Sequence, residues 1–373
     1  MSVQPELTAD VVVIGAGPAG SIAALNLAPF MRVLVVDKGG EHAERIGENL
    51  PAAANRLLHD MGLYEDFVAQ GHLLSRHMRS AWGDSAIWET DAIRNLDGPG
   101  WHLDRCRFDA WLRAAARRRG AAIVDDTAVR GIDRRDEQHD AWRLELMRGG
   151  RELTADARWV IDASGRRAVL ARRFGGGREP RDRLVCGWIF GKDTAEVSEE
   201  GDANELHAER GGWWYTSSLP DRGRVLAFYT DADLPDASSA HSRDGLLARV
   251  QSVPELAGRL AYCGFQPNER YGFCAAHTAT QDAVAGPGWL AVGDAALAFD
   301  PLSSQGLFNA LYTGLAGADA VYRRSVEASA SAFDEYRRQI EGIREAYVKN
   351  LLACYQLESR WGDMPFWRRR RAG

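Results

Sequence analysis

One short stretch near the N-terminus restricts the possible folds more than any other feature of the chain. Residues 10–14 read DVVVI, the turn GAGPAG follows directly, and the small-residue segment SIAALNLA comes next. A buried strand, a G-x-G-x-x-G turn and a helix in this order begin a βαβ unit. Gly15 allows the tight turn, Gly17 lets a pyrophosphate approach the backbone, and Gly20 lets helix and strand pack closely. The sequence therefore predicts a Rossmann-type α/β domain.

A second apolar run, RVLVVDK, ends at Asp37, 17 residues after the last glycine of the turn. A carboxylate at this place can accept hydrogen bonds from the ribose hydroxyls of a dinucleotide, whose phosphates face the amides at the helix N-terminus. This cofactor is NAD or FAD. The residues expected to bind it here are Gly15, Gly17, Pro18, Ala19, Gly20, Asp37 and Lys38.

Two later strand-to-turn segments distinguish between these cofactors. Residues 159–165 read WVIDASG, and residues 291–306 read AVGDAALAFDPLSSQG. A chain with both segments after a single glycine motif resembles the large flavoprotein family that includes the aromatic hydroxylases and the flavin-dependent halogenases. The resemblance covers most of the chain, with gaps in the middle, and implies FAD.

The resemblance also implies which residues contact the flavin. The acid that matches Asp294 hydrogen-bonds the ribityl chain, and the turn at 301–306 passes the pyrimidine edge. The helix that begins near Leu307 points its positive end there, where reduced flavin carries negative charge. In RIGENLP, Arg45 and Glu48 resemble the family's R-x-G-E segment. Further implied contacts are Arg105 in DRCRFDAWL, Val129 in TAVRG through its backbone, Ser164, Gly165, Pro301, Ser304, Gln305 and Gly306.

The cofactor motifs lie in three separated parts of the chain. Segments between them, such as LVCGWIFGKDT and GRVLAFYTD, alternate like strands and predict an antiparallel sheet over the flavin. The tail FWRRRRAG is expected to be a frayed, solvated end. The expected fold is therefore α/β, with an aromatic-hydroxylase-like arrangement. Its parts are a discontinuous FAD-binding domain (1–75, 101–175 and 275–330), an antiparallel-sheet substrate domain (76–100 and 176–274), and C-terminal helices with the basic tail (331–373).

Composition excludes several classes of function. A net charge of −6 gives no bulk attraction to nucleic acid or to a membrane surface. The five cysteines are odd in number and form no C-x-x-C pair, which argues against a zinc site and favours a reducing compartment. No basic leader and no long apolar run is present. We therefore expect a cytoplasmic protein without a metal, a nucleic-acid partner or a membrane span.

The hydroxylase branch of the family implies a reaction. In that branch, reduced flavin adds O2 at C4a, and the hydroperoxide passes one oxygen to an electron-rich ring. Because only one G-x-G-x-x-G is present, electrons must come from NAD(P)H that binds transiently or from a partner flavin reductase. The expected function is that of an FAD-dependent monooxygenase of an aromatic substrate.

Two kinds of substrate are open, a free aromatic molecule and a Trp side chain in a partner polypeptide. The second follows from a resemblance to the flavoproteins that mature tryptophylquinone-containing amine oxidases and dehydrogenases. In GGWWYTSSLP, an aromatic pocket for such a ring is expected from Trp213, Trp214 and Tyr215. No catalytic residue is assigned; Glu48 and Tyr215 are the candidates, and His102 and His207 are not chosen.

Halogenation is disfavoured as an alternative. Halogenases of the family use an active-site lysine downstream of the G-E segment, and this chain has no lysine between Lys38 and Lys192. Their W-x-W-x-I-P motif, aligned on Pro220, falls on Tyr215, Ser217 and Leu219, although the DPLSSQG turn is halogenase-like. An FAD-dependent reductase of a small molecule and a non-catalytic flavin-bearing chaperone of a partner protein also remain open.

Overall fold

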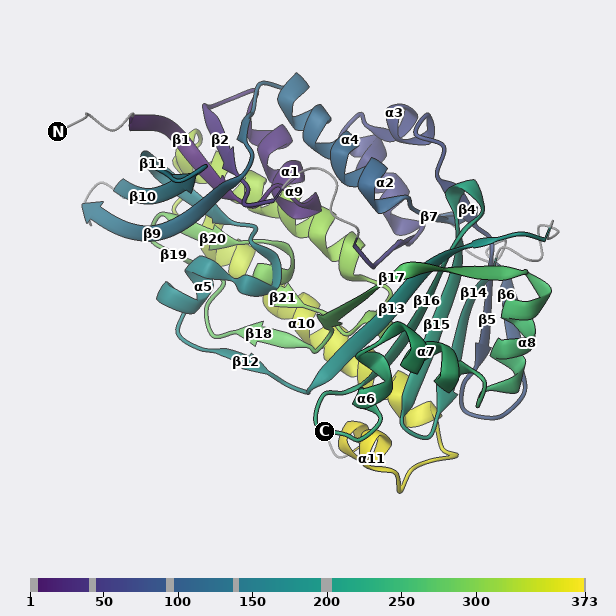
Figure 1. The fold of residues 1–373 in the computed structure, drawn as a ribbon. Helices are drawn as coiled ribbons and strands as arrows, with labels where there is room; N and C mark the ends of the chain where they lie inside the picture. The colour runs from purple at the N-terminus through teal and green to yellow at the C-terminus, as the bar shows by residue number, and fades with distance from the viewer. Residues whose placement is uncertain (1–5, 40–44, 92–96, 137–140, 196–202, 372–373) are drawn as a thin grey trace.

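Two large β-sheets occupy the two ends of the molecule, with helices packed around them (Figure 1). The structure, a computed structural model, describes residues 6–39, 45–91, 97–136, 141–195 and 203–371. One sheet has eight strands and carries the glycine-rich turn, and the other has seven. Within the described ranges, no helix is long and apolar enough to cross a bilayer.

The eight-stranded sheet has the order β19-β20-β11-β1-β2-β8, and β10 extends it from β11 to β9. Its central pairs are parallel, which agrees with the predicted βαβ start. Apolar residues run continuously along β1 and β2 because helices or other strands cover both faces. The strands are β1 (Glu6–Ile14), β2 (Val33–Val36), β8 (Ala122–Val124), β9 (Thr127–Asp136), β10 (Ala141–Arg148), β11 (Arg151–Asp162), β19 (Ala285–Gly286) and β20 (Trp289–Ala291).

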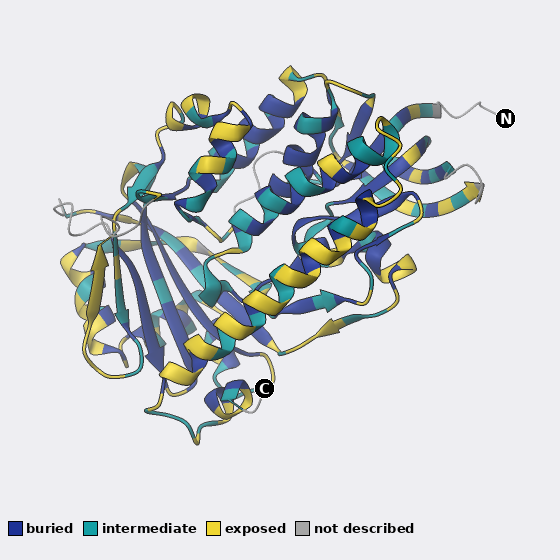
Figure 2. Cartoon of the chain, turned by 180° about the vertical axis from the view of Figure 1, so that it is seen from behind, coloured by how far each residue is buried: buried dark blue, intermediate teal, exposed yellow. Residues whose placement is uncertain are grey.

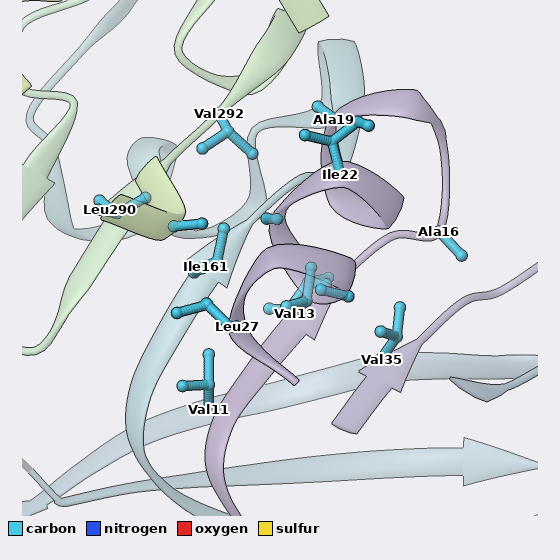
Figure 3. Packing of buried hydrophobic residues seen from close by; sticks show 14 of the residues in the cluster. Val11, Val13, Ala16, Ala19, Ile22, Leu27, Val35, Ile161, Leu290 and Val292 are labelled. Atoms are coloured by element: carbon cyan, nitrogen blue, oxygen red, sulfur yellow. The ribbon is translucent and has the colours of Figure 1, made fainter. Parts of the chain in front are cut away.

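Helix α1 (Pro18–Leu27) is buried along nearly its whole length between this sheet and its helical neighbours. Figure 3 shows its Ile22 and Leu27 packed among Val11 and Val13 of β1 and Ile161 of β11. Small residues such as Ala23 and Ala24 allow this close packing. The other helices of this end are α2 (Ala53–Asp60), α3 (Tyr64–Val68), α4 (Arg105–Arg118), α5 (Val169–Phe174) and α9 (Gly306–Ser325).

The seven-stranded sheet has the order β17-β13-β16-β15-β14-β5-β6. It is antiparallel as expected, except that β14 and β5 pair in parallel. Its strands β14 and β15 form a hairpin joined at residues 210–211. The strands are β5 (His77–Ala81), β6 (Trp88–Asp91), β13 (Leu184–Asp193), β14 (Ala203–Glu209), β15 (Gly212–Leu219), β16 (Gly223–Asp231) and β17 (Phe265–Ala275).

Three helices that the sequence analysis did not predict cover the outer face of this sheet. They are α6 (Ala237–Ala240), α7 (Arg243–Val250) and α8 (Pro254–Tyr262). Two small sheets connect the ends of the molecule: β12 (Arg178–Pro180), β18 (Ala279–Gln281) and β21 (Leu297–Ala298) form one, and β3 (Asn49–Leu50), β7 (Gly100–His102) and β4 (Leu73–Ser75) form the other. The predicted fold class is confirmed.

Helix α10 (Ala332–Leu357) is in contact with both ends of the molecule. Its first half packs on the core of the eight-stranded sheet through Phe333 and Tyr336, and its last turn brings Tyr355 to the seven-stranded sheet. Figure 2 shows the opposite side of this helix exposed along the back of the molecule. Helix α10 therefore packs against both large sheets rather than forming a separate layer.

The basic tail corrects a prediction, because it is not a solvated end. Residues Pro365–Arg371 form helix α11, in which Phe366 and Trp367 are fully buried. Arg370 is 7% exposed, and its Nη2 donates to Asp231 Oδ1 at 2.7 Å. The two apolar side chains anchor the helix, and the buried carboxylate of Asp231 needs a cation beside it.

Candidate functional site

A cavity of about 510 Å³ extends from the glycine-rich turn to the inner face of the seven-stranded sheet. Most of the residues predicted from the sequence line this one space, although they come from distant parts of the chain. They are Gly15, Gly17, Pro18, Ala19, Asp37, Lys38, Arg45, Glu48, Arg105, Val129, Ser164, Gly165, Asp294, Pro301, Ser304, Gly306, Leu307, Trp213 and Tyr215.

The glycine-rich turn connects β1 to α1 and lies beside the end of β11. Gly15 has φ +104°, and a Cβ atom there would lie 2.4 Å from the carbonyl oxygen of Ala163, so a larger residue cannot occupy this turn. At Gly17 the nearest atom to such a Cβ is Arg45 Nη1, 3.9 Å away, so its backbone faces open space. This exposed backbone at the N-terminus of α1 fits a pyrophosphate.

Asp37 lies beside this turn, at the end of β2. Its Oδ2 accepts a hydrogen bond from the backbone N–H of Ala16 at 2.7 Å, and its Oδ1 accepts one from Gly39 at 2.8 Å. Two backbone donors thus hold the carboxylate at the edge of the cavity, where it fits an adenosine ribose.

Two predicted contacts do not line the cavity. A Cβ atom at Gly20 would lie 1.9 Å from the carbonyl oxygen of Gly15, so Gly20 serves the close packing of turn and helix. Gln305 is exposed just before the first residue of α9. Gly20 belongs to the glycine-rich motif and Gln305 to the DPLSSQG turn. The path of the backbone decides which positions of such a motif face a ligand.

Arg105 and Arg45 shape the loop that precedes Glu48. Arg105 makes a two-pronged contact with Asp109, with nitrogen–oxygen distances of 3.2 Å, and its Nη1 donates to the carbonyl oxygen of Gly47 at 2.8 Å. Arg45 Nη1 lies 3.5 Å from Asp109 Oδ2. Both guanidinium groups also line the cavity, so they add positive charge along the cofactor path.

Asp294 follows the strand β20 and faces the cavity. Its Oδ2 lies 3.6 Å from Nε of Arg166, whose Nη2 donates to the carbonyl oxygen of Phe299 at 2.9 Å. Arg166 therefore connects the turn at 293–295 with Phe299, which precedes the turn at 301–303. Arg166 was not predicted as a site residue, because nothing in the sequence shows which distant turns an arginine will reach.

The turn at 301–303 is held by tyrosines of α10. Tyr355 donates its hydroxyl hydrogen to Asp300 Oδ2 at 2.7 Å, and Tyr347 accepts the backbone N–H of Asp300 at 2.7 Å. Burial raises the pKa of Asp300 to about 6. These residues were missed; the one signal in the sequence was the spacing of the two tyrosines, which suits one face of a helix.

Glu48 lies where the cavity reaches the sheet. Its side chain is 1% exposed, and Oε1 accepts the backbone N–H of Gly47 at 3.1 Å. The other oxygen, Oε2, has no hydrogen-bond partner among the residues that the structure describes. Burial raises the pKa of this carboxyl to about 7. A buried carboxyl with a free oxygen and such a pKa can exchange a proton with a bound molecule near neutral pH.

Aromatic side chains form the wall opposite this carboxyl. The rings of Trp213 and Tyr229 stack with centroids 3.9 Å apart and an interplanar angle of 10°. The hydroxyl of Tyr215 donates to Asn204 Oδ1 at 3.1 Å. Burial raises the pKa of both tyrosines. The charge of Glu48 adds to this at Tyr215, and Cys186 and then Glu48 add to it at Tyr229, so both are neutral phenols. We call the part of the cavity lined by Glu48, Trp213, Tyr215 and Tyr229 the aromatic chamber. It is apolar and aromatic, with Glu48 as its acidic group.

Trp214 is a correction to the expected aromatic pocket. It lies on the outer face of the sheet, packed with Phe228 and Leu246, and its Nε1 donates to Glu209 at 3.2 Å. Successive residues of a strand point to opposite faces, so β15 directs Trp213 and Tyr215 into the cavity and Trp214 away from it.

Among the residues that the structure describes, no histidine lines the cavity, and no lysine lies beside the aromatic rings. All three lysines are in the described ranges; Lys38 lines the ribose end of the cavity, and Lys192 Nζ donates to the carbonyl oxygen of Asp221 at 2.7 Å on the surface. His102 is fully buried outside the cavity lining, and burial lowers its pKa to about 4. His207 is paired with Glu205 at 3.1 Å. In the described ranges, no cluster of three or more metal-ligating side chains is found.

Comparison with known proteins agrees with this geometry. A family model described as FAD binding domain matches residues 8–312. Putative FAD-dependent oxidoreductase LodB of Marinomonas mediterranea is 27% identical, and the alignment covers 97% of each chain. The matched range includes the glycine-rich turn and the turn at 301–306, which both line the cavity.

Two solved structures have the same fold. The myxobacterial chondrochloren halogenase CndH aligns with a TM-score of 0.88 and 22% identity over 98% of this chain and 86% of its own. The peptidyl tryptophan dihydroxylase QhpG, described as essential for tryptophylquinone cofactor biogenesis, aligns with a TM-score of 0.76 and 23% identity over 98% and 79%. At these identities they establish the fold, which supports more than one chemistry.

We predict that Asp294→Ala weakens FAD binding while the fold remains. The variant loses a hydrogen bond to an ionised acceptor, worth about 1.5 to 3 kcal/mol, so the FAD dissociation constant should rise about tenfold or more. Titration of the apo-protein with FAD measures this change. Asp319→Ala, on the exposed side of α9, is the control and should bind FAD like the wild type. A wild-type affinity for Asp294→Ala would make Asp294 an ordinary turn residue.

Proposed function

Because this chain belongs to the FAD binding domain family, we propose that it is a monooxygenase that hydroxylates an electron-rich aromatic ring. The observation that supports this proposal is a single cavity that starts at the dinucleotide turn and ends in an aromatic chamber beside the unpartnered Oε2 of Glu48. A flat ring fits between such walls, and a buried carboxyl beside it suits a reaction in which the ring loses a proton.

The net reaction defines what the chain's residues must do. Bound reduced FAD supplies two electrons and the activation of O2, and NAD(P)H or a partner flavin reductase regenerates it. One oxygen atom replaces a ring hydrogen, and the other leaves as water after taking up two protons. The displaced hydrogen leaves its carbon as a proton, and Glu48 accepts it through Oε2. Trp213 and Tyr229 hold the ring and exclude water from the chamber.

Each part of the cavity has a separate task in this proposal. The turn at Gly15 and Gly17, with Asp37, binds the adenosine and the pyrophosphate. Asp294 binds the ribityl chain, and the N-terminus of α9 faces the pyrimidine edge, where it stabilises negative charge. Glu48 lies on the chamber side, with its carboxyl next to the ring.

For the substrate, we favour the indole of a Trp residue presented by a partner polypeptide over a free aromatic molecule. Support comes from the fold shared with QhpG, which is described as a peptidyl tryptophan dihydroxylase. The stacked rings of Trp213 and Tyr229 provide a surface of the size and polarity of an indole.

The chief alternative is halogenation, which the fold shared with CndH leaves open. A halogenase of this family would need an amine at the chamber to hold the halogen. The amine of Lys192 is hydrogen-bonded to the carbonyl oxygen of Asp221 at the surface, and Lys38 lies at the Asp37 end of the cavity. Neither amine is therefore beside the aromatic rings. This arrangement favours oxygen transfer.

We predict incorporation of oxygen and no incorporation of halide. The FAD-loaded protein, a flavin reductase with NADH, and a library of Trp-containing peptides are incubated under oxygen-18 gas with added bromide. Mass spectrometry should show peptides that gained labelled oxygen on Trp, and none that gained bromine. Lys192→Ala should behave like the wild type.

A brominated product that disappears in Lys192→Ala would refute this proposal in favour of halogenation. Flavin turnover that reduces a carbon–carbon bond of a test substrate, without labelled oxygen, would favour the reductase alternative. Binding of a peptide without any flavin turnover would favour the chaperone.

We predict that turnover depends on ionised Glu48. A base works in its deprotonated form, so kcat should rise as pH increases through about 7, the raised pKa of this carboxyl. Glu48→Gln should lower kcat by about 10²-fold or more and remove this rise, while the FAD absorbance shows that cofactor is retained. Glu345→Gln, at an exposed position of α10, is the control and should keep the wild-type profile. An unchanged pH profile in Glu48→Gln would exclude this carboxyl as the base.

A further inference from the structure

Two cysteines face each other across neighbouring strands in the wall of the cavity. Cys186 of β13 and Cys274 of β17 are directly opposite in the antiparallel register, and both line the cavity as free thiols. Opposite residues point to the same face of a sheet, with Cα atoms about 4.5 to 5.5 Å apart. This separation lies within the range of about 4.4 to 6.8 Å that a disulfide needs.

The two thiols have different surroundings. Cys186 is 1% exposed, and burial raises the pKa of its thiol. A hydrogen bond from Cys186, and then the positive charge of Arg166, lower the pKa of Cys274. Cys274 is also partly exposed, so a small molecule in the cavity can reach it. This asymmetry is typical of a reactive thiolate with a resolving thiol beside it.

We propose that Cys186 and Cys274 form a redox-active dithiol that reduces hydrogen peroxide and becomes a cross-strand disulfide. The Cys274 thiolate attacks one peroxide oxygen, the O–O bond breaks, and a sulfenic acid and water result once the leaving hydroxide takes up a proton. The Cys186 sulfur then attacks the Cys274 sulfur, the S–O bond breaks, and a second water leaves. Two thiols are oxidised by two electrons, and one peroxide is reduced to two waters.

The position of the pair indicates the source of the peroxide. This source rests on the proposed function, because reduced flavin that meets O2 without a substrate releases hydrogen peroxide into the same cavity. The dithiol lies close to Tyr229, since Cys186 of β13 is directly opposite Tyr229 of β16 in the antiparallel register. The pair therefore intercepts peroxide before it reaches the aromatic wall, and the disulfide links the edge strand β17 to β13.

The test adds peroxide directly and reads the thiols. The purified FAD-loaded protein is treated with one equivalent of hydrogen peroxide, unreacted thiols are blocked with iodoacetamide under denaturing conditions, and peptides are analysed by mass spectrometry. The number of alkylated cysteines should fall from all five to three, with a reducible cross-link between the peptides that contain Cys186 and Cys274. The exposed Cys354 should stay alkylated.

Single variants separate the two roles. Cys186→Ser should leave Cys274 as a sulfenic acid that dimedone traps, and Cys274→Ser should leave Cys186 as an unreacted thiol. Cys354→Ser is the matched control and should form the disulfide as the wild type does. Alkylation of both Cys186 and Cys274 after peroxide, or oxidation of Cys354 before them, would overturn the proposal. Because no hydroxylation is measured, failure of the proposed function and failure of the dithiol remain distinguishable.

Discussion

The parallel pairing of β1 with β11 is the contact on which the rest of the site depends. It places Ile14 beside Asp162, so the glycine-rich turn and the turn at 163–165 leave the sheet at the same edge. The two turns can pack closely because Gly15 has no side chain to meet the carbonyl of Ala163. The cofactor residues from distant segments converge there because the carboxyl ends of parallel strands share one edge of a sheet.

The far end of the cavity depends on a second connection, which runs through the C-terminal helices. Tyr355 donates to Asp300 and accepts a hydrogen bond from Trp213 Nε1 at 3.3 Å, so one buried phenol links the flavin-side turn to the aromatic wall. The guanidinium of Arg370 lies 5.1 Å from the Tyr355 ring centroid and is paired with Asp231 of β16. The basic tail is thus part of the packing that holds the turn at 301–303 and the aromatic wall in place.

The sequence predicted those features that local geometry determines. The strand–glycine–helix order specified the first βαβ unit, and the spacing to Asp37 specified its ribose end, since both depend on short stretches of chain. Side-chain direction was not predicted for Trp214, because its neighbours are aromatic as well and no alternation was visible. The roles of Arg166 and Asp300, and the pairing of Cys186 with Cys274, depend on contacts and strand register between distant segments, which a single sequence does not contain.

In the proposed function, one cavity holds both the flavin and the aromatic ring, with Glu48 between them. A crystal structure of the FAD complex can show this arrangement. We expect density for the isoalloxazine ring between the turn at 301–306 and Glu48, with its reactive face toward Trp213 and Tyr229. Density in the aromatic chamber itself would leave no room beside the flavin for a substrate ring, and density outside the cavity would separate the flavin from Glu48; either result would rule the arrangement out.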